Sequence, residues 1–162
     1  MKVIGIDPGT ANCGYGIVHE SGGRLRAIGH GSWSTPAGER LELRLKTIFE
    51  GVAALIEEHA PDAVALEESF VGVDARTALS VGQARGAVLV AAALRDIECT
   101  EYAPARVKQA VCGYGRADKA QVQRMVKAIL SLQALPTPNH ASDALAVAIC
   151  HALAAPLLKM VG

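Results

Sequence analysis

The chain has 162 residues, of which 51% are hydrophobic and 20% are charged. This composition excludes an intrinsically disordered chain, and the length suffices for one domain with a buried core. The net charge of zero, taken alone, argues against a nucleic-acid partner. We therefore expect residues 1–162 to form a single globular domain.

The sequence contains no recognisable secretory or membrane-spanning segment. Asp7 interrupts the first apolar stretch, and the longest one, at 144–158, contains Pro156 and is shorter than the ~20 residues that span a bilayer. The four cysteines form no C-x-x-C pair, which argues against a zinc site or a disulfide framework. These features predict a cytoplasmic protein with reduced thiols and no membrane contact.

Basic residues are concentrated in one part of the chain. Residues 1–100 contain nine basic and thirteen acidic residues, whereas residues 101–130 contain six basic and two acidic ones. A local excess of positive charge is typical of a surface that contacts phosphates. The same pattern also fits the solvated faces of two helices, and the counts alone do not separate the two interpretations.

The first third of the chain predicts three antiparallel strands followed by a helix. Apolar runs at 3–7 and 14–18 flank a Pro-Gly pair, and the alternating segment 24–34 follows a Gly-Gly turn. Between Glu39 and His59, apolar residues recur at three- and four-residue steps, which is the spacing of an amphipathic helix. Pro61 is expected to end this helix.

Strands and helices alternate along the rest of the chain. We expect a buried strand at 62–67, followed by a helix rich in small residues that is capped by Asp74 or Thr77 and ends near Arg95. A strand at 98–102 comes next, and then a short helix that begins at Pro104 and breaks at 113–115. The last two elements are a helix from Asp118 to Leu132 and an apolar helix that is capped by Asn139 and ends near Leu153. This order predicts an α/β domain with one mixed sheet covered by helices.

Acidic residues end two of the predicted buried strands. Asp7 stands directly before a Pro-Gly pair. Side chains alternate along a strand, so Glu67 and Glu68 point to opposite faces and one of them shares a face with Asp7. If the strand ends align, two carboxylates meet in one crevice, where a hard divalent cation would relieve their repulsion. Asp7 is also compatible with an ordinary turn acid that bonds to its own bend.

His140 and Asp143 lie three residues apart on a helix whose other face is apolar, so both project from one side of its first turn. A polar helix start would explain His140, and attraction to the helix dipole would explain Asp143. Together with Asp7 and Glu67, however, they place three carboxylates and one imidazole at element ends beside apolar runs, where purely structural acids are rare.

This donor set suits Mg²⁺ or Mn²⁺. Two such ions would activate water and stabilise both oxygens of an in-line phosphodiester displacement, so no covalent nucleophile is required. Because the imidazole of His140 is a softer, neutral ligand, we expect Mn²⁺ to support activity at least as well as Mg²⁺.

Six sequence blocks resemble, in order and spacing, those of the RuvC family of Holliday-junction endodeoxyribonucleases. They are GIDPGT at 5–10, GYG at 14–16, ALEESF at 65–70, VGQARG at 81–86, VKQAVCGYGRADKAQVQ at 107–123 and HASDALAVAI at 140–149. The blocks cover nearly the whole chain and are highly specific in combination. The resemblance implies a ribonuclease-H-like fold with a mixed five-stranded sheet flanked by helices.

The resemblance also implies a function and partners. It implies a homodimer that makes paired nicks in the two like-polarity strands of a four-way DNA junction during homologous recombination and DNA repair, in partnership with a branch-migration motor. The helix expected at 75–95 resembles the family's dimer-interface helix, although its composition also fits packing on its own sheet.

Individual residues match the family's functional positions. The catalytic positions are matched by Asp7, Glu67, His140 and Asp143, the aromatic that inserts among junction bases by Phe70, and basic positions near DNA by Lys108 and Lys119. Stacking on bases is physically reasonable for Phe70, which is equally compatible with a core position. His140 stands where many family members have an aspartate, which lowers the negative charge of the site and bears on its metal preference.

Three other functions compete with this interpretation. The D-P-G-T segment also resembles the first phosphate-binding bend of sugar kinases and actin-like ATPases, but such enzymes need a second domain and further phosphate loops. An RNA-processing nuclease on the same fold is disfavoured by the order of the blocks. A junction-binding protein without catalysis is disfavoured because the acidic set is complete.

Overall fold

The computed structural model describes residues 1–68 and 74–161, with side chains up to residue 155. Its elements are β1 (Lys2–Asp7), β2 (Asn12–Ser21), β3 (Arg24–Ser34), α1 (Leu41–His59), β4 (Ala63–Glu67), α2 (Ala75–Ala93), β5 (Cys99–Tyr102), α3 (Pro104–Cys112), α4 (Lys119–Ile129) and α5 (Asn139–Val161). The predicted order of strands and helices is confirmed.

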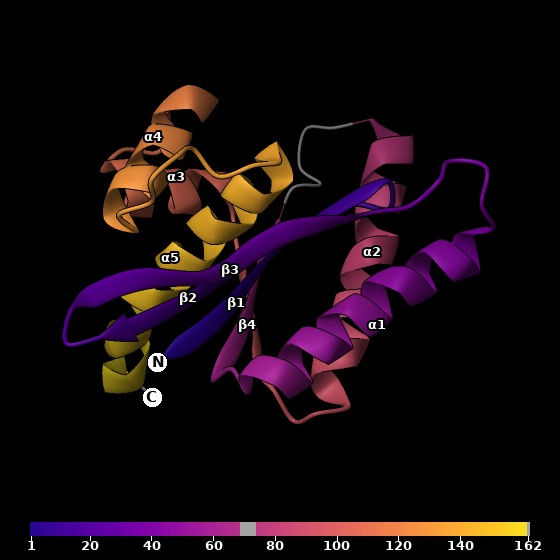
Figure 1. Ribbon diagram of the computed structural model, residues 1–162, viewed down its shortest axis with the longest axis horizontal. Coiled ribbons are helices and arrows are strands. Elements are labelled where there is room, and N and C mark those ends of the chain that lie inside the picture. Colours follow the sequence, from indigo (N-terminus) through magenta and orange to yellow (C-terminus); the bar gives the residue numbers. More distant parts are fainter. Residues whose placement is uncertain (69–73, 162) are drawn as a thin grey trace.

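The strands form one five-stranded sheet in the order β3-β2-β1-β4-β5. The pairs β1–β2 and β2–β3 are antiparallel, whereas β1–β4 and β4–β5 are parallel. Helices α1 and α2 lie on one side of the sheet and α3, α4 and α5 on the other (Figure 1). The predicted mixed sheet between helical layers is therefore confirmed.

Alternation along the strands divides the core into two clusters. Ile4 and Ile6 of β1 pack with residues of α1 and α2. Val3 of β1 and Ala65 of β4 belong to the cluster that includes α3, α4 and α5. Successive strand residues point to opposite faces, so odd-numbered positions of both β1 and β4 face the α5 side. Burial of both faces is typical of parallel strands, such as the pair β1 and β4.

Helix ends differ from the prediction in three helices. Helix α4 ends at Ile129 rather than Leu132, because Ser131 adopts a left-handed conformation with φ of 53°. Helix α2 ends at Ala93 rather than Arg95, and Asp96 is left-handed in the same way. Helix α5 begins at Asn139 itself and continues to Val161 rather than ending near Leu153. Pro156 removes only one backbone donor, and the alanines and leucines around it favour helix.

Local sequence signals explain where α2 and α4 begin. The side chain of Asp74, rather than that of Thr77, caps α2 by accepting hydrogen bonds from the backbone of Arg76 and Thr77. Asp118 and Gln121 form a reciprocal capping box at α4. The four cysteines are free, as predicted. Along the described part of the chain, no helix combines the length and apolarity needed to cross a membrane.

Candidate active site

The strand-borne acids lie at one edge of the sheet. Strands β1 and β4 are parallel and in register up to the pair Ile6–Leu66, and each strand has one further residue, Asp7 or Glu67. Both residues occupy odd-numbered positions, so alternation directs them to the α5 side of the sheet. Glu67, rather than Glu68, is therefore the acid that shares a face with Asp7.

Glycines in the strands allow α5 to approach this edge closely. A Cβ atom on Gly14 of β2 would lie 2.1 Å from the carbonyl oxygen of His140, and one on Gly5 of β1 would lie 2.0 Å from that of Ala144. No larger side chain fits at either position without moving the helix. The GID and GYG segments thus allow the first turns of α5 to lie directly against the end of β1.

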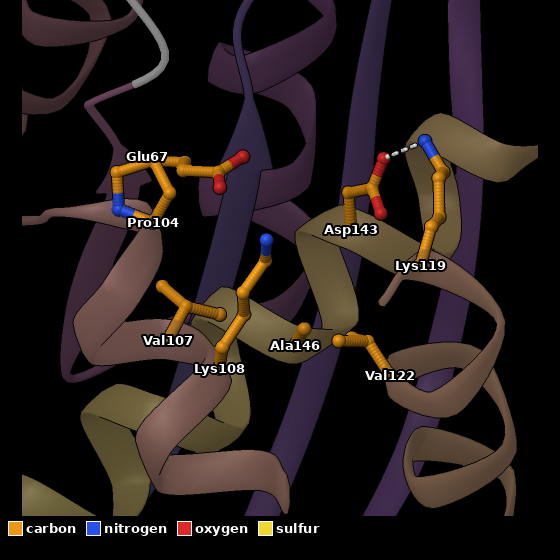
Figure 2. Close-up of a pocket in the computed structure, with 8 residues that line it drawn as sticks. All are labelled: Glu67, Pro104, Val107, Lys108, Lys119, Val122, Asp143 and Ala146. Atoms are coloured by element: carbon orange, nitrogen blue, oxygen red, sulfur yellow. Dashed lines mark hydrogen bonds and ion pairs between the residues drawn. The ribbon is translucent and has the colours of Figure 1, made fainter. Parts of the chain in front are cut away.

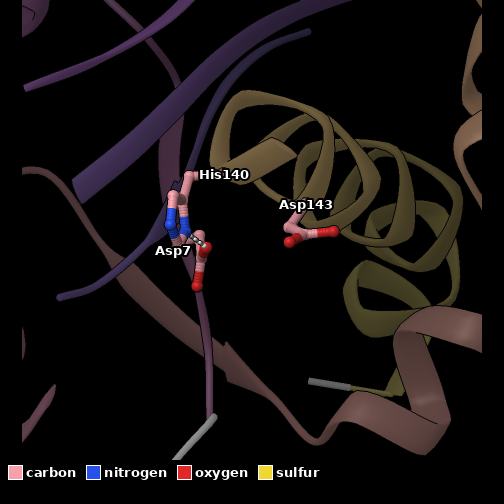
Figure 3. A group of neighbouring side chains, drawn as sticks. All are labelled: Asp7, His140 and Asp143. Carbon is pink, nitrogen blue, oxygen red and sulfur yellow. Dashed lines mark hydrogen bonds and ion pairs between the residues drawn. The ribbon is translucent and has the colours of Figure 1, made fainter. Parts of the chain in front are cut away.

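Helix α5 contributes the other two predicted residues. Nδ1 of His140 lies 2.8 Å from Oδ2 of Asp7 and forms a hydrogen bond with it. Asp7, His140 and Asp143 each offer one ligand atom, and these atoms lie within 4.8 Å of one another. Figure 3 shows the imidazole against the carboxylate of Asp7, with Asp143 on the same helix nearby. The predicted grouping of these three residues is thus present.

Burial makes Asp7 an unusual acid. Burial raises its pKa above the ordinary value, and the charge of Asp143 raises it further, while the hydrogen bond with His140 acts in the opposite direction. A carboxylate in this position is stabilised by any positive charge that enters the site. The arrangement therefore favours a bound cation next to Asp7.

Glu67 lies with Asp143 in a pocket of about 220 Å³ between β4 and helices α3, α4 and α5. Lys108 of α3 and Lys119 of α4 also line this pocket (Figure 2). Nζ of Lys119 lies 2.7 Å from Oδ2 of Asp143, and Figure 2 shows Lys108 extending into the space between Glu67 and Asp143. Two acids and two lysines thus line one opening on the surface.

A second pocket, of about 280 Å³, is lined by Asp7 and His140. It is formed by the turn after β1 and by the first turns of α2, including Thr10 and Ser80, whose hydroxyl groups are hydrogen bonded. Sequence reasoning singled out neither residue. Thr10 falls in the GIDPGT block, whereas nothing in the pattern of α2 distinguishes Ser80.

The structure brings most of the predicted residues together. Asp7, His140 and Asp143 form one group, and Glu67, Lys108 and Lys119 share the adjoining pocket with Asp143. Phe70 falls at 69–73, outside the described residues.

Comparison with known proteins identifies the family. The family model described as "Crossover junction endodeoxyribonuclease RuvC" matches residues 3–151. The protein of that name from Chloroflexus aggregans is 51% identical over 162 residues, which cover 100% of this chain and 99% of the relative. The protein of that name from Syntrophomonas wolfei is 53% identical over 151 residues, 93% of this chain and 88% of the relative.

Solved structures agree with these matches. Thermus thermophilus RuvC in complex with a Holliday junction substrate superposes with a TM-score of 0.93 at 39% identity, over 98% of this chain and 97% of that one. This likeness supports the ribonuclease-H-like fold. A yeast mitochondrial Holliday junction resolvase, at 11% identity and a TM-score of 0.66 over 98% of this chain and 82% of that one, shares the fold alone. The chain therefore belongs to the RuvC family of crossover junction endodeoxyribonucleases.

Proposed function

We propose that this protein is a metal-dependent endodeoxyribonuclease that resolves four-way DNA junctions. The observation that carries the proposal is the grouping of Asp7, His140 and Asp143, beside Glu67, at one edge of the sheet in a member of the RuvC family. A relative at 39% identity has been solved with a Holliday junction substrate. Junction DNA is therefore the substrate that we assign to this chain.

The donor set fits hard divalent cations. Three carboxylates and one imidazole supply oxygen and nitrogen ligands of the kind that Mg²⁺ and Mn²⁺ accept. We assign Asp7, Glu67, His140 and Asp143 as the residues that would hold two ions per site. When bound, such ions supply Lewis-acid activation of water and charge stabilisation at the phosphodiester.

The remaining residues would position the DNA. Lys108 and Lys119 line the pocket next to the acids, and their ammonium groups would bind phosphates of the DNA. The hydrogen bond between His140 and Asp7 fixes the orientation of the Asp7 carboxylate. By its place in the family pattern, Phe70 would insert among the junction bases.

Paired nicks require two active sites, which a homodimer supplies. Helix α2 carries the exposed apolar residues Leu79 and Val90, and its C-cap residue Leu94 is exposed as well. Added Cβ atoms at Gly82 and Gly86 would meet no atom of the described chain within 4 Å. These five residues recur at three- and four-residue steps, so they share one side of the helix. We propose this stripe, called the α2 stripe below, as the dimer contact that sets two sites to nick strands of like polarity.

We further propose that residues 1–162 act as one nuclease domain in the cytoplasm. The enzyme would work in homologous recombination and DNA repair together with a branch-migration motor complex, as the family pattern implies.

Substitution of Asp7 tests the proposal. Asp7→Asn keeps the shape of the side chain but removes its charge, so the variant should bind a four-way DNA junction and fail to nick it in the presence of Mn²⁺. Asp96→Asn is a matched control, because Asp96 is exposed and lies in a turn after α2. It should nick like the wild type.

Three results would contradict the assignment. Wild-type activity in Asp7→Asn would exclude the acidic group as the catalytic centre. If the wild type binds junctions without ever nicking them, or cleaves structured RNA in preference to junction DNA, the protein is instead a junction-binding protein or an RNA-processing nuclease.

A further inference from the structure

We propose that Lys119 acts as a counter-ion for Asp143 in the metal-free site and passes to a DNA phosphate when a divalent cation binds. This inference rests on the proposed function, because it assumes the metal site and the DNA substrate assigned above. It adds a coupling between metal binding and DNA binding, and Lys119 is the group that carries this coupling.

The ion pair lies where a metal would bind. Nζ of Lys119 is 2.7 Å from Oδ2 of Asp143, and Asp143 is one of the three residues whose ligand atoms lie within 4.8 Å of one another. A cation held by this carboxylate would stand next to an ammonium group. Like charges at this range repel, so the two compete for Asp143.

The backbone of Lys119 is held firmly while its side chain is free to move. Lys119 is the first residue of α4 and lies within the capping box formed by Asp118 and Gln121. Nε2 of Gln123 donates a 3.0 Å hydrogen bond to Asn139, which joins α4 to the start of α5. The Lys119 side chain is 55% exposed, so breaking the ion pair requires only a change of rotamer.

The pocket offers the released ammonium group a second position. Lys119, Lys108, Glu67 and Asp143 line the same opening of about 220 Å³ (Figure 2). A phosphate bound beside Lys108 would therefore lie within reach of Lys119 as well. In the metal-free protein Lys119 neutralises Asp143, and in the loaded complex it neutralises the DNA.

This exchange makes metal and DNA binding cooperative. Lys119 weakens metal binding in the absence of DNA, and a phosphate that takes up Lys119 removes the competition. Linkage requires the same factor in both directions, so the metal must strengthen DNA binding as much as DNA strengthens metal binding. Without Lys119, the part of the coupling that it carries disappears.

The first experiment measures Mn²⁺ affinity in the absence of DNA, by electron paramagnetic resonance of the free ion. Lys119→Met should bind Mn²⁺ about two- to fivefold more tightly than the wild type, the range expected for loss of a half-exposed ion pair. Lys119→Arg keeps the positive charge and should bind like the wild type. Lys46→Met is the control, because it breaks an exposed ion pair with Glu50 on α1, and it should change nothing.

The second experiment measures junction affinity by fluorescence anisotropy in EDTA and in Ca²⁺, with a denaturing gel to verify that the strands stay intact. Ca²⁺ should increase the affinity of the wild type by a larger factor than that of Lys119→Met. Equal Mn²⁺ affinity in the wild type and Lys119→Met, or equal stimulation by Ca²⁺, would overturn the exchange while leaving the proposed function intact. A wild type that binds no Mn²⁺ would overturn both.

Discussion

Nδ1 of His140 lies 2.8 Å from Oδ2 of Asp7, and this hydrogen bond joins residues that are 133 positions apart in the sequence. Asp7 ends the central strand of the sheet, and His140 lies in the first turn of the helix that crosses it. The contact makes the imidazole part of the acidic group rather than a polar residue at a helix start. His140 is thus the residue most suited to set the metal preference.

Replacement of His140 by aspartate should change that preference. The wild type should nick junctions with Mn²⁺ at least as fast as with Mg²⁺, because an imidazole nitrogen is a softer ligand than a carboxylate oxygen. In His140→Asp the site gains a hard oxygen ligand and a negative charge, so the ratio of Mn²⁺-supported to Mg²⁺-supported nicking should fall. Both metals are titrated at equal ionic strength. Clearly superior Mg²⁺ activity in the wild type would contradict the prediction.

Replacement of Lys108 should weaken DNA binding in a salt-dependent way. Loss of one phosphate contact lowers the slope of log affinity against log salt concentration by about 0.9. Lys108→Met should show this decrease on junction DNA, measured by anisotropy over a salt series. The exposed Lys46→Met variant should keep the wild-type slope. A parallel shift of the Lys108→Met line, without change of slope, would argue against a phosphate contact.

Gly14 should be needed for the site as well as for stability. An alanine Cβ there would lie 2.1 Å from the carbonyl oxygen of His140, so α5 must move away from β2. Overpacking of this kind costs about 1–3 kcal/mol. Gly14→Ala should therefore unfold at lower denaturant concentration and nick more slowly. Gly38→Ala, whose added Cβ meets nothing within 4 Å, should do neither. Unchanged activity in Gly14→Ala would show that the position of α5 is not critical.

Much of this architecture could be predicted because local signals and side-chain periodicity agree. The Pro-Gly pair after Asp7, the alternation in β4 and the cap at Asp74 each specify their own element. Local signals do not decide whether Glu67 or Glu68 shares a face of the sheet with Asp7. This depends on the register of β1 with β4, which is set by tertiary packing. The ion pair of Lys119 with Asp143 and the hydrogen bond of Thr10 with Ser80 likewise depend on how helices pack against the sheet.

The helix ends were the least predictable part. Pro156 is an ordinary signal for the end of a helix, yet α5 continues past it. Leu132 favours continuation of a helix, yet α4 ends at Ile129. A single missing donor is tolerated in a helix with strong helix formers on both sides, whereas a left-handed residue such as Ser131 ends a helix outright. Nothing in the sequence around Ser131 indicates its left-handed conformation.

A charge placed on the α2 stripe should separate the subunits. Val90 is 52% exposed, and a glutamate there would bury an unpaired charge in the proposed dimer contact. Val90→Glu should sediment as a monomer in analytical ultracentrifugation and should nick junctions singly rather than in pairs. Leu153→Glu is the matched control, since Leu153 is 49% exposed on α5. A dimeric Val90→Glu variant would exclude the stripe as the contact.

The stability of the fold should fall on mild acidification because of His151. Nδ1 of this buried histidine lies 3.0 Å from the hydroxyl oxygen of Tyr102, and burial lowers the pKa of His151 below its ordinary value of 6.5. In the unfolded chain His151 therefore takes up a proton near pH 6.5, whereas in the folded chain its imidazole stays neutral at that pH. The unfolding free energy must decrease as the pH falls below about 6.5 and stay level above it, as far as His151 is concerned.

His151→Gln cannot titrate, so denaturant unfolding between pH 8 and pH 5 should show a smaller decrease in this variant than in the wild type. Tyr102→Phe should lose about 1 kcal/mol at every pH, the contribution of one hydrogen bond, while keeping the wild-type dependence. Identical pH dependence in the wild type and His151→Gln would mean that another group destabilises the fold in acid.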